Sequence, residues 1–504
     1  MSQQRPAEAG DIQALLASGF ASLPEAAFLL LRIVEPQRAR AWLARAPVTT
    51  MADLGRHQPT VLQLALSANG LRRLGLDAAA LAAFAPEFVA GMAGDKARSR
   101  RLGDIGANAP THWRWGAAGE PDILLLLYAE SGKLATWQGE LTEALQQSGL
   151  DVASVLATSD MGDKEPFGFT DGMSQPRIDW ADTRVPGTPD DLDYGNLVAT
   201  GEFLLGYPNE YGLYTDRPLL PGAGALPRAT DQPGLADLGR NGTYLVLREL
   251  HQDVRGFWRF VADRAGPGGA EALAEAMVGR RLSGDPLVPP QDAPIRGIGP
   301  DPTDIARNRF TYAGDADGLH CPFGAHVRRA NPRTGDLPGG RRGWLGRILG
   351  ALGLPPADLR SDLVASTRFH RILRRGREFG AWVEPERAMR PDCPDPQSGL
   401  QFICLGASIS RQFEFVQNAW LASAKFDGLS DESDPLTGNR MPLGAGAPTD
   451  RFSLPQANGA TRRLHQLPAF VTVRGGGYFF LPGLRALRFL AYHRNSGASL
   501  REVL

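Results

Sequence analysis

Apolar residues gather in short runs that are separated by polar and glycine-rich stretches. In the first third of the chain, four runs are dense in leucine, valine and alanine and have the length of strands. One of them, 122–130, shows no polar alternation, which is typical of a strand buried on both faces. Two segments between the runs place their apolar residues at helical spacing. We expect strands over 26–34, 60–67, 122–130 and 151–158, and helices over 35–46 and 134–150.

The alternation of strand and helix partly recurs toward the C-terminus. Strands are expected over 242–250, 399–407 and 471–482, and helices over 253–266, 409–423 and 484–495. Three other stretches are rich in proline, glycine and aspartate and are expected to be loops. These stretches are 216–240, 266–320 and 426–470. Loops of that length in a compact protein are more often functional than idle.

The order of these elements predicts the fold class. A β-α-β unit followed by a second β-α-β unit is the order of a ferredoxin-like domain. Because the order partly recurs, we predict an α+β protein with two ferredoxin-like halves and antiparallel sheets, over 1–215 and 216–504. A chain of 504 residues can bury a large core without disulfides or metal ions to stabilise it.

The charge and the cysteine content of the chain limit which partners and which cellular compartment we expect. The chain has 54 Lys and Arg against 55 Asp and Glu, so its charge gives no reason to expect nucleic acid or an acidic membrane surface as a partner. The apolar runs are too short to span a bilayer. The three cysteines, Cys321, Cys393 and Cys404, form neither a disulfide framework nor zinc-ligand spacing. With no secretion signal at the N-terminus, these features predict a cytoplasmic protein.

The stretch EPFGFTDGMSQPRI, 165–178, contains the first candidate for chemistry, Asp171. Thr-Asp-Gly is a common turn, because aspartate bonds the local backbone and glycine permits a positive φ. Alternatively, Phe167 and Phe169 bury the segment and leave Asp171 in a partly apolar pocket. Burial would raise the pKa of this carboxyl group and suit it to proton transfer.

A second stretch, HCPFGAHVRRANPR at 320–333, places His326 directly after a glycine and an alanine. Small residues let a broad, flat group approach, and the arginines that follow can pair with carboxylates. The combination suits a haem, with imidazole on the iron and guanidinium on a propionate. His320 is a rival ligand that lacks the two small neighbours. A basic surface loop is the alternative here, as a solvated basic turn is for the third stretch, 368–380.

Taken together, the three stretches resemble one family, the dye-decolorising haem peroxidases. GFTDG at 168–172 is similar to the family's G-x-x-D-G motif, AHVRRANPR at 325–333 to its proximal-histidine segment, and RILRRGREFG at 371–380 to its distal-arginine segment. Each motif alone is modestly specific, whereas all three in family order are highly specific. The resemblance extends over nearly the whole chain.

The resemblance implies a fold of the dimeric α+β barrel type, with haem b held in the C-terminal half. It implies that His326 is the iron ligand, that Asp171 and Arg374 are catalytic, and that Arg333 pairs with a propionate. Further residues are expected to line the haem site: Phe169, Gly172, Ser174, Gln175, Leu400 and Phe402. The iron-bound histidine should also donate a hydrogen bond to an acidic residue. The candidates for that residue are Asp427, Glu432 and Glu414.

The implied activity is reduction of hydrogen peroxide with one-electron oxidation of organic donors such as dyes and phenolics. Asp171 would move a proton on the peroxide, and Arg374, which stays charged, would stabilise the negative charge that develops there. Two alternatives remain open at this point: a haem-handling protein that carries haem or extracts its iron, with incidental peroxidase activity, and a haem-free binding protein. A homo-oligomer is also expected.

Overall fold

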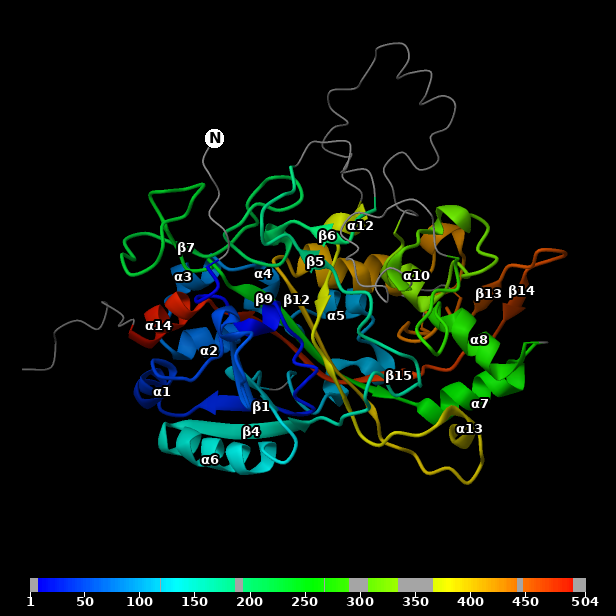
Figure 1. Cartoon of the computed structure of the whole chain (residues 1–504), viewed down its shortest axis with the longest axis horizontal. Coiled ribbons are helices and arrows are strands. Elements are labelled where there is room, and N and C mark those ends of the chain that lie inside the picture. Colours follow the sequence, from blue (N-terminus) through cyan, green and yellow to red (C-terminus); the bar gives the residue numbers. More distant parts are fainter. Residues whose placement is uncertain are drawn as a thin grey trace, which may run out of the picture.

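The N-terminal half contributes four strands to a central antiparallel sheet (Figure 1). The computed structural model describes residues 8–117, 119–185, 194–266, 268–289, 307–333, 366–441 and 447–492. The elements of this half are β1 (Glu25–Ile33), α1 (Pro36–Leu43), β2 (Thr60–Leu66), β3 (Ile123–Ala129), α6 (Leu134–Gln147) and β4 (Leu150–Ala157). The strands lie in the order β2-β3-β1-β4, which is the order of a ferredoxin-like sheet.

The C-terminal half repeats this arrangement. Its elements are β9 (Thr243–Gln252), α7 (Val254–Arg264), β10 (Leu373–Arg374), β11 (Arg377–Phe379), β12 (Gly399–Gly406), β15 (Val471–Leu481) and α14 (Leu484–Tyr492). The strands lie in the order β10-β12-β9-β15, with β11 also paired to β12. Counted from its own first strand, this half therefore has the same strand order as the N-terminal half. The prediction of two ferredoxin-like halves is confirmed.

The two halves join into one nine-stranded sheet through a narrow contact. Phe480 of β15 pairs with Leu66 of β2, and this is the single register pair between the two strands. Within the described residues the strands form an open sheet, so the closed barrel that the resemblance implied is not seen. The domain boundary at residue 215 stays a prediction.

Shorter elements surround the sheet. The helices are α2 (Ala68–Arg73), α3 (Ala78–Ala82), α4 (Pro86–Ala90), α5 (Lys96–Leu102), α8 (Gly269–Val278), α10 (His326–Ala330), α12 (Ser366–Phe369) and α13 (Pro385–Ala388). The small strands are β5 (Arg177–Ile178), β6 (Leu197–Val198), β7 (Leu219–Leu220), β8 (Ala236–Asp237), β13 (Phe452–Leu454) and β14 (Arg462–Leu464). No helix of the described part of the chain is both long and apolar enough to cross a membrane.

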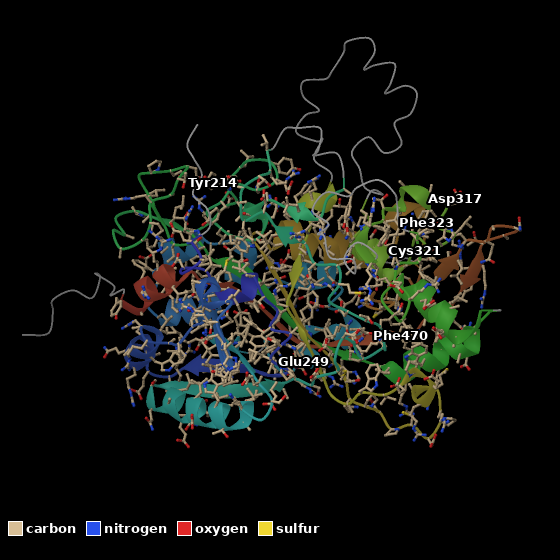
Figure 2. All side chains as sticks on the ribbon, viewed as in Figure 1. Tyr214, Glu249, Asp317, Cys321, Phe323 and Phe470 are labelled. Carbon is tan, nitrogen blue, oxygen red and sulfur yellow. The ribbon has the colours of Figure 1, made fainter. Side chains whose placement is uncertain are left out.

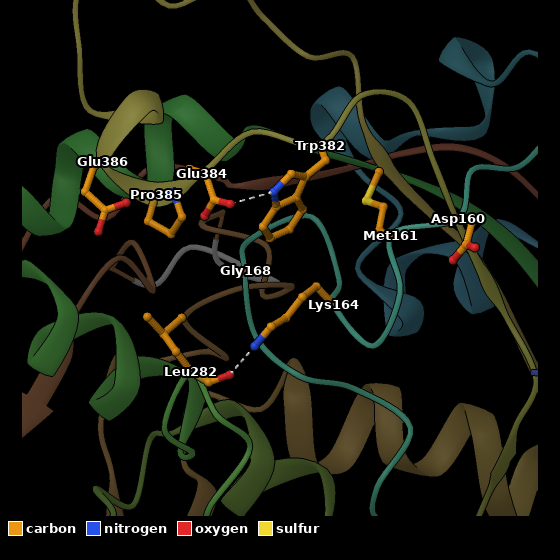
Figure 3. A pocket seen from close by; sticks show the side chains of 9 residues that line it. All are labelled: Asp160, Met161, Lys164, Gly168, Leu282, Trp382, Glu384, Pro385 and Glu386. Carbon is orange, nitrogen blue, oxygen red and sulfur yellow. Dashed lines mark hydrogen bonds between the residues drawn. The ribbon is translucent and has the colours of Figure 1, made fainter.

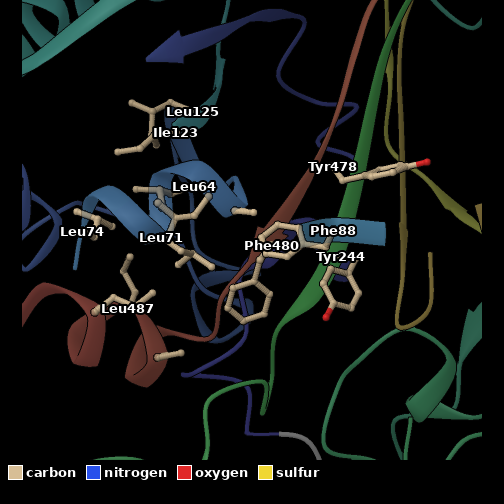
Figure 4. Close-up of a cluster of buried hydrophobic side chains, with 14 of the residues drawn as sticks. Leu64, Leu71, Leu74, Phe88, Ile123, Leu125, Tyr244, Tyr478, Phe480 and Leu487 are labelled. Atoms are coloured by element: carbon tan, nitrogen blue, oxygen red, sulfur yellow. The ribbon is translucent and has the colours of Figure 1, made fainter. Parts of the chain in front are cut away.

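The burial of strand β3 on both faces explains why its sequence shows no alternation of apolar and polar residues. All seven of its residues are buried. Ile123, Leu125 and Leu127 enter one apolar cluster, whereas the residues between them enter a second cluster on the opposite face of the sheet. Figure 4 shows part of the first cluster, in which Leu125 lies in the same core as Phe480 and Tyr244 of the other half. Both faces of this strand are therefore covered.

A third apolar cluster packs α7 and α8 against the start of β15. Phe470, labelled in Figure 2, lies edge-on to Phe257, with ring centroids 5.4 Å apart. Phe167 joins the same cluster, 4.7 Å from Phe257. The indole N–H of Trp258 donates a hydrogen bond of 2.9 Å to the carbonyl oxygen of Phe167. The third cluster thus fixes the loop that carries Asp171.

Several sequence predictions differ from the structure. The stretches 216–240 and 426–470 are expected to be loops, but they contain the paired strands β7 and β8 and the paired strands β13 and β14. The helix expected over 409–423 is present but is wound as two π-helical segments, Ser410–Glu414 and Val416–Leu421. Bonds of the i→i+5 type, such as the one from Ala422 N to Gln417 O, account for the wider turn. The stretch 266–320, expected to be a loop, contains the helix α8, whose alanine-rich sequence is a good helix former.

Candidate active site

A cavity of about 950 Å³ is lined by the C-terminal half of the sheet and by the segments packed over it. Its wall combines residues of β9, β12 and β15 with residues of the loop 162–175, of α10 and of the π-helical segment Val416–Leu421. This volume is at the upper end of the range for small-molecule sites, which is about 300–1,000 Å³. The cavity is large enough for a broad organic cofactor.

The loop that carries Asp171 is organised by the half-buried carboxylate of Glu165. Glu165 accepts hydrogen bonds from the backbone N–H groups of Phe167 (3.1 Å) and Phe169 (3.0 Å). The side chain of Gln252 donates a further bond of 2.9 Å to the same carboxylate. Asp171 itself bonds through its N–H to the carbonyl of Asp163. The expected tight bend is present, with Gly172 next in sequence at φ 81°.

Asp171 and Arg374 form an ion pair on the cavity wall. Arg374 Nη1 lies 2.7 Å from Asp171 Oδ1, and the two side chains are about one-third exposed, at 31% and 37%. Arg374 belongs to β10, and its backbone N–H donates a bond of 3.0 Å to Gln175 Oε1. Gln175 therefore positions the arginine, while 203 residues of sequence separate the two members of the ion pair.

The pKa of Asp171 differs from the sequence-based expectation. Burial raises the pKa of this carboxyl group, but the Arg374 guanidinium, the backbone N–H of Gly172 and the nearby His326 together outweigh burial. The net result is a lowered pKa, so Asp171 is ionised at neutral pH. The expectation that burial would raise this pKa is wrong, because it left out the arginine paired with the carboxylate.

His326 is the first residue of α10 and lies on the same cavity wall. Its Nδ1 lies 2.9 Å from Asp434 Oδ2, and Asp434 is fully buried. The other oxygen of Asp434 accepts bonds from the backbone N–H groups of Leu436 (3.0 Å) and Thr437 (2.8 Å). Burial alone would raise the pKa of Asp434, but His326, the backbone N–H of Thr437 and the charge of Arg329 lower it to about 2.

Asp434 corrects the sequence-based candidates for the acidic partner of His326. Glu414 instead binds Arg98 and the hydroxyl of Tyr478. Glu432 accepts a hydrogen bond from the N–H of Ser453, and Asp427 is exposed. All three predictions are therefore wrong. The available signal was the sequence Asp-Pro-Leu-Thr, in which an aspartate side chain commonly caps the N–H groups that follow it.

The other predicted residues fall into two groups. Six line the cavity together with Asp171, His326 and Arg374: Phe169, Gly172, Ser174, Gln175, Leu400 and Phe402. Arg333 is not among the described residues that line it. Its Nη1 donates to the carbonyl oxygens of Asn308 (3.1 Å) and Phe310 (2.7 Å), and its guanidinium lies 3.8 Å from the ring centroid of Phe310.

Several cavity residues were missed by the sequence analysis. Arg371 lines the cavity and donates to Asn196 Oδ1 (2.8 Å) and the hydroxyl of Tyr194 (3.1 Å). Arg280 and Arg307 also line the wall. Arg371 lies within the quoted segment RILRRGREFG and could have been singled out. By contrast, Arg280 and Arg307 lie in the stretch 266–320, whose composition predicts a loop.

A second histidine, His370, also lines this cavity, whereas the rival His320 does not. The His370 ring stacks on Phe415 at a centroid distance of 3.5 Å, and its Nδ1 contacts the carbonyl of Arg411. Burial lowers the pKa of His370 to about 4. This ring is thus held against an aromatic side chain, and no carboxylate of the described residues pairs with it as Asp434 pairs with His326.

The residues of the cavity fit a haem. With Nδ1 of His326 bonded to a carboxylate, its Nε2 keeps the lone pair that a metal ligand needs, and no described residue bonds this atom. Arginines on the wall suit carboxylate groups of a cofactor. A bare metal ion is a poorer fit, because no group of three potential side-chain ligands occurs among the described residues.

Comparison with known proteins finds sequence relatives that are peroxidases. No protein-family model matches the chain. The dye-decolorizing peroxidase msp1 of Mycetinis scorodonius is 28% identical over 449 residues, which are 85% of this chain and 76% of that protein. The multifunctional dye peroxidase DyP2 of an Amycolatopsis species is 29% identical over 448 residues, which are 85% of this chain and 82% of that protein.

Solved structures agree on the fold. A fungal DyP-type peroxidase from Auricularia auricula-judae superposes with a TM-score of 0.70 at 24% identity, covering 97% of this chain and 100% of that one. The sequence relatives cover most of the chain, and the solved structures share its fold. Both indicate the same family as the three motifs at the cavity. The chain belongs to the dye-decolorising peroxidase family.

Proposed function

We propose that this protein is a haem-dependent peroxidase that reduces hydrogen peroxide and oxidises organic donors such as dyes and phenolics. The observation that carries the proposal is one cavity with an imidazole anchored to a buried carboxylate and an ion-paired Asp171 and Arg374. The relatives named as dye peroxidases support the same activity. No feature of the cavity favours a carrier or an iron-extracting protein, which would need neither member of the ion pair.

His326 holds the cofactor in this proposal. A haem held here would supply the redox-active iron that links the two-electron reduction of peroxide to one-electron oxidations of the donor. The ring of His326 is oriented by its bond to Asp434, and that bond keeps Nε2 free to bind the iron. Haem b is the form we propose, since nothing on the wall supplies a covalent attachment of the C-x-x-C-H type.

Asp171 and Arg374 act on the peroxide. Asp171 is ionised, so it accepts a proton from one oxygen of the peroxide and returns it to the other, directly or through a water molecule. Arg374 lies within 2.7 Å of this carboxylate and stabilises the negative charge that develops as the O–O bond breaks. Because the pKa of Asp171 is below its usual value of 3.8, the reaction with peroxide should stay fast in mildly acidic solution.

A single experiment tests the proposal. The absorbance spectrum of the haem-loaded protein is recorded by stopped flow before and after one equivalent of hydrogen peroxide. A Soret band that changes within milliseconds and returns on addition of a dye is the expected result. A Soret band that peroxide leaves unchanged would exclude a peroxidase and leave a haem-handling protein. Absence of any Soret band after reconstitution would exclude both.

Two sequence-based expectations remain part of this proposal. A cytoplasmic location is supported by the free and buried state of Cys321, Cys393 and Cys404, since unpaired thiols are usual in a reducing compartment. A homo-oligomer stays a prediction. Size-exclusion chromatography with light scattering would measure the oligomeric state directly.

A further inference from the structure

A second hollow, of about 510 Å³, lies on the outer side of the loop that carries Asp171. One bank consists of Trp382, Glu384, Pro385 and Glu386, and the other of Asp160, Met161, Lys164, Gly168 and Leu282. We call these nine residues the outer groove. Figure 3 shows the indole of Trp382 directed between the two banks, with Met161 beside it and Glu384 on its other side. Segments far apart in the sequence therefore build the groove.

The outer groove and the large cavity share a wall. Gly168 lines the groove, whereas its two neighbours in sequence, Phe167 and Phe169, line the cavity. One layer of backbone thus separates the two spaces. A molecule in the groove would lie next to the proposed haem cavity without entering it. This position suits a donor too bulky to pass into the cavity.

Gly168 keeps this shared wall thin. Its φ of 104° is a conformation that side chains rarely adopt, and a Cβ placed here would lie 3.2 Å from Pro385 Cγ and 3.7 Å from Leu282 Cδ2. Pro385 and Leu282 belong to opposite banks of the groove. A side chain at position 168 would therefore occupy the floor of the groove between them.

The lining of the groove selects an aromatic molecule. Trp382 is only partly buried, and its Nε1 donates a hydrogen bond of 3.2 Å to Glu384 Oε1. Val383, the next residue, packs on the third apolar cluster, whereas the indole of Trp382 faces the groove. An indole face with Met161 beside it offers the flat, polarisable surface on which aromatic rings stack.

The charge of the groove selects a cation. Three carboxylates line it, from Asp160, Glu384 and Glu386, against the one ammonium group of Lys164. Lys164 Nζ donates to Thr170 Oγ1 and to the carbonyl of Leu282, both at 2.9 Å, so this ammonium is turned toward the floor. Asp160 accepts a hydrogen bond of 2.9 Å from the N–H of Gly162 and Glu384 accepts one from Trp382, but none of the three carboxylates forms an ion pair with a described residue. A cation over the indole would gain both attraction to the ring and attraction to the carboxylates.

We propose that the outer groove binds cationic aromatic donors, with their rings on Trp382 and their positive charge beside Glu384 and Glu386. The proposal rests on the proposed peroxidase function, because it names the class of donor that the enzyme would oxidise. Anionic sulfonated dyes are excluded from this groove by the same carboxylates. Small phenols, which can enter the large cavity, do not depend on it.

The test measures dye binding before any turnover. Methylene blue, a phenothiazinium cation, and a sulfonated anthraquinone anion are each equilibrated with the purified protein in the absence of peroxide, and bound dye is measured by equilibrium dialysis. Trp382→Leu should weaken methylene blue binding by about tenfold, the scale of a partly desolvated cation–π contact. Glu384→Gln with Glu386→Gln should weaken it about fivefold, the scale of two exposed charge pairs, and added salt should reduce this difference. Binding of the anion should not weaken in either variant.

Controls separate the groove from general effects. Glu140→Gln with Glu143→Gln removes two exposed carboxylates from α6 and should leave dye binding unchanged. In turnover, the groove variants should raise the KM for methylene blue and leave the KM for hydrogen peroxide unchanged. Equal affinity of wild type and both groove variants for methylene blue would overturn the proposal, as would a parallel loss for both dyes. Dye binding that follows the groove residues in a protein unreactive toward peroxide would contradict the peroxidase function but not the groove.

Discussion

The two halves of the sheet share one strand order and differ in what they present on it. In the N-terminal half, all seven residues of β3 are buried and apolar. In the C-terminal half, β9 buries Arg248, Glu249 and Gln252 among its apolar residues. Both halves are built on the same backbone plan, so the plan alone does not place the site. The position of the site is instead decided by the side chains in each half that lie outside the apolar clusters.

The three buried polar residues of β9 each have a side-chain partner. Arg248 binds the carboxylate of Asp104 and lines the large cavity. Glu249 accepts a hydrogen bond of 2.9 Å from Trp115 Nε1. Gln252 bonds the carboxylate of Glu165, which holds the loop of Asp171. Because an unpaired buried polar group is costly, these pairs allow the half to carry a polar cavity while it stays folded. We therefore expect substitutions at the cavity, including the loop of Asp171, to affect chemistry and substitutions in the apolar core of the N-terminal strands to affect stability.

The largest effect should come from His326→Ala. Removing the imidazole removes the nitrogen whose ring is held by Asp434, so haem binding should be lost or the remaining haem should give an altered spectrum. Haem titration followed at the Soret band measures this, and far-UV circular dichroism checks that the fold is intact. A normal high-spin spectrum at wild-type affinity would refute the assignment of His326.

The next effect should come from the ion pair. Arg374→Leu and Asp171→Asn should each slow the reaction with peroxide by about 10²–10³-fold, the scale for loss of a charged group that acts on a transition state. Haem should stay bound, because neither residue contacts His326 or Asp434 through a hydrogen bond. Stopped-flow rates over a range of peroxide concentrations measure the loss. Wild-type rates in both variants would remove these residues from the site.

A core substitution in the N-terminal half should lower the stability of the protein and leave its reaction with peroxide unchanged. Leu125→Ala leaves a void in the first apolar cluster and should lower the free energy of unfolding by about 3 kcal/mol, a typical cost for a fully buried leucine. The folded variant should keep a wild-type Soret band and peroxide rate. Urea unfolding measures the loss of stability, and the stopped-flow assay on the same sample measures the rate of reaction with peroxide. A changed spectrum in the folded protein would show that the two halves are not separable in this way.

The smallest effect should be a pH dependence from Glu378, which lines the cavity. Burial, with the negative charges of Asp171 and Glu165, raises its pKa from 4.5 to about 7. The folded protein thus holds a proton that the unfolded chain releases, so the stability from this carboxyl group is complete below pH 4.5 and is lost as pH rises to about 7. The unfolding free energy of wild type relative to Glu378→Gln should fall over that interval. Parallel curves for the two proteins from pH 4 to 8 would contradict the raised pKa.

Much of the fold could be predicted from the sequence. Long apolar runs gave β1, β2, β3, β9, β12 and β15 to within a few residues, because such strands are buried on both faces. Two-residue strands such as β10 carry too few positions for a periodic signal. The π-helical winding at Ser410–Glu414 was equally out of reach, since it changes the hydrogen bonding without changing the spacing of apolar residues enough to detect.

Site residues that belong to a sequence motif could be predicted. Site residues whose position depends on tertiary contacts could not. Asp171, His326 and Arg374 lie on one cavity, as the three motifs together suggested. Asp434 was missed because several carboxylates stand within one loop, and the backbone path alone decides which of them reaches His326. Arg333 was assigned by its place in a motif, whereas its left-handed backbone, with φ 53°, accompanies a guanidinium bonded to two carbonyl groups.

The narrow join between the halves has a consequence for cooperativity. Phe480 and Leu66 make one backbone pair between β15 and β2, yet the first apolar cluster contains Leu125 from one half and Tyr244 and Phe480 from the other. Side-chain packing rather than backbone pairing therefore couples the halves. A protein that repeats one unit twice could melt in two steps, but a shared core ties both melting events together. Loss of order in the N-terminal half should accordingly release the haem in the same transition.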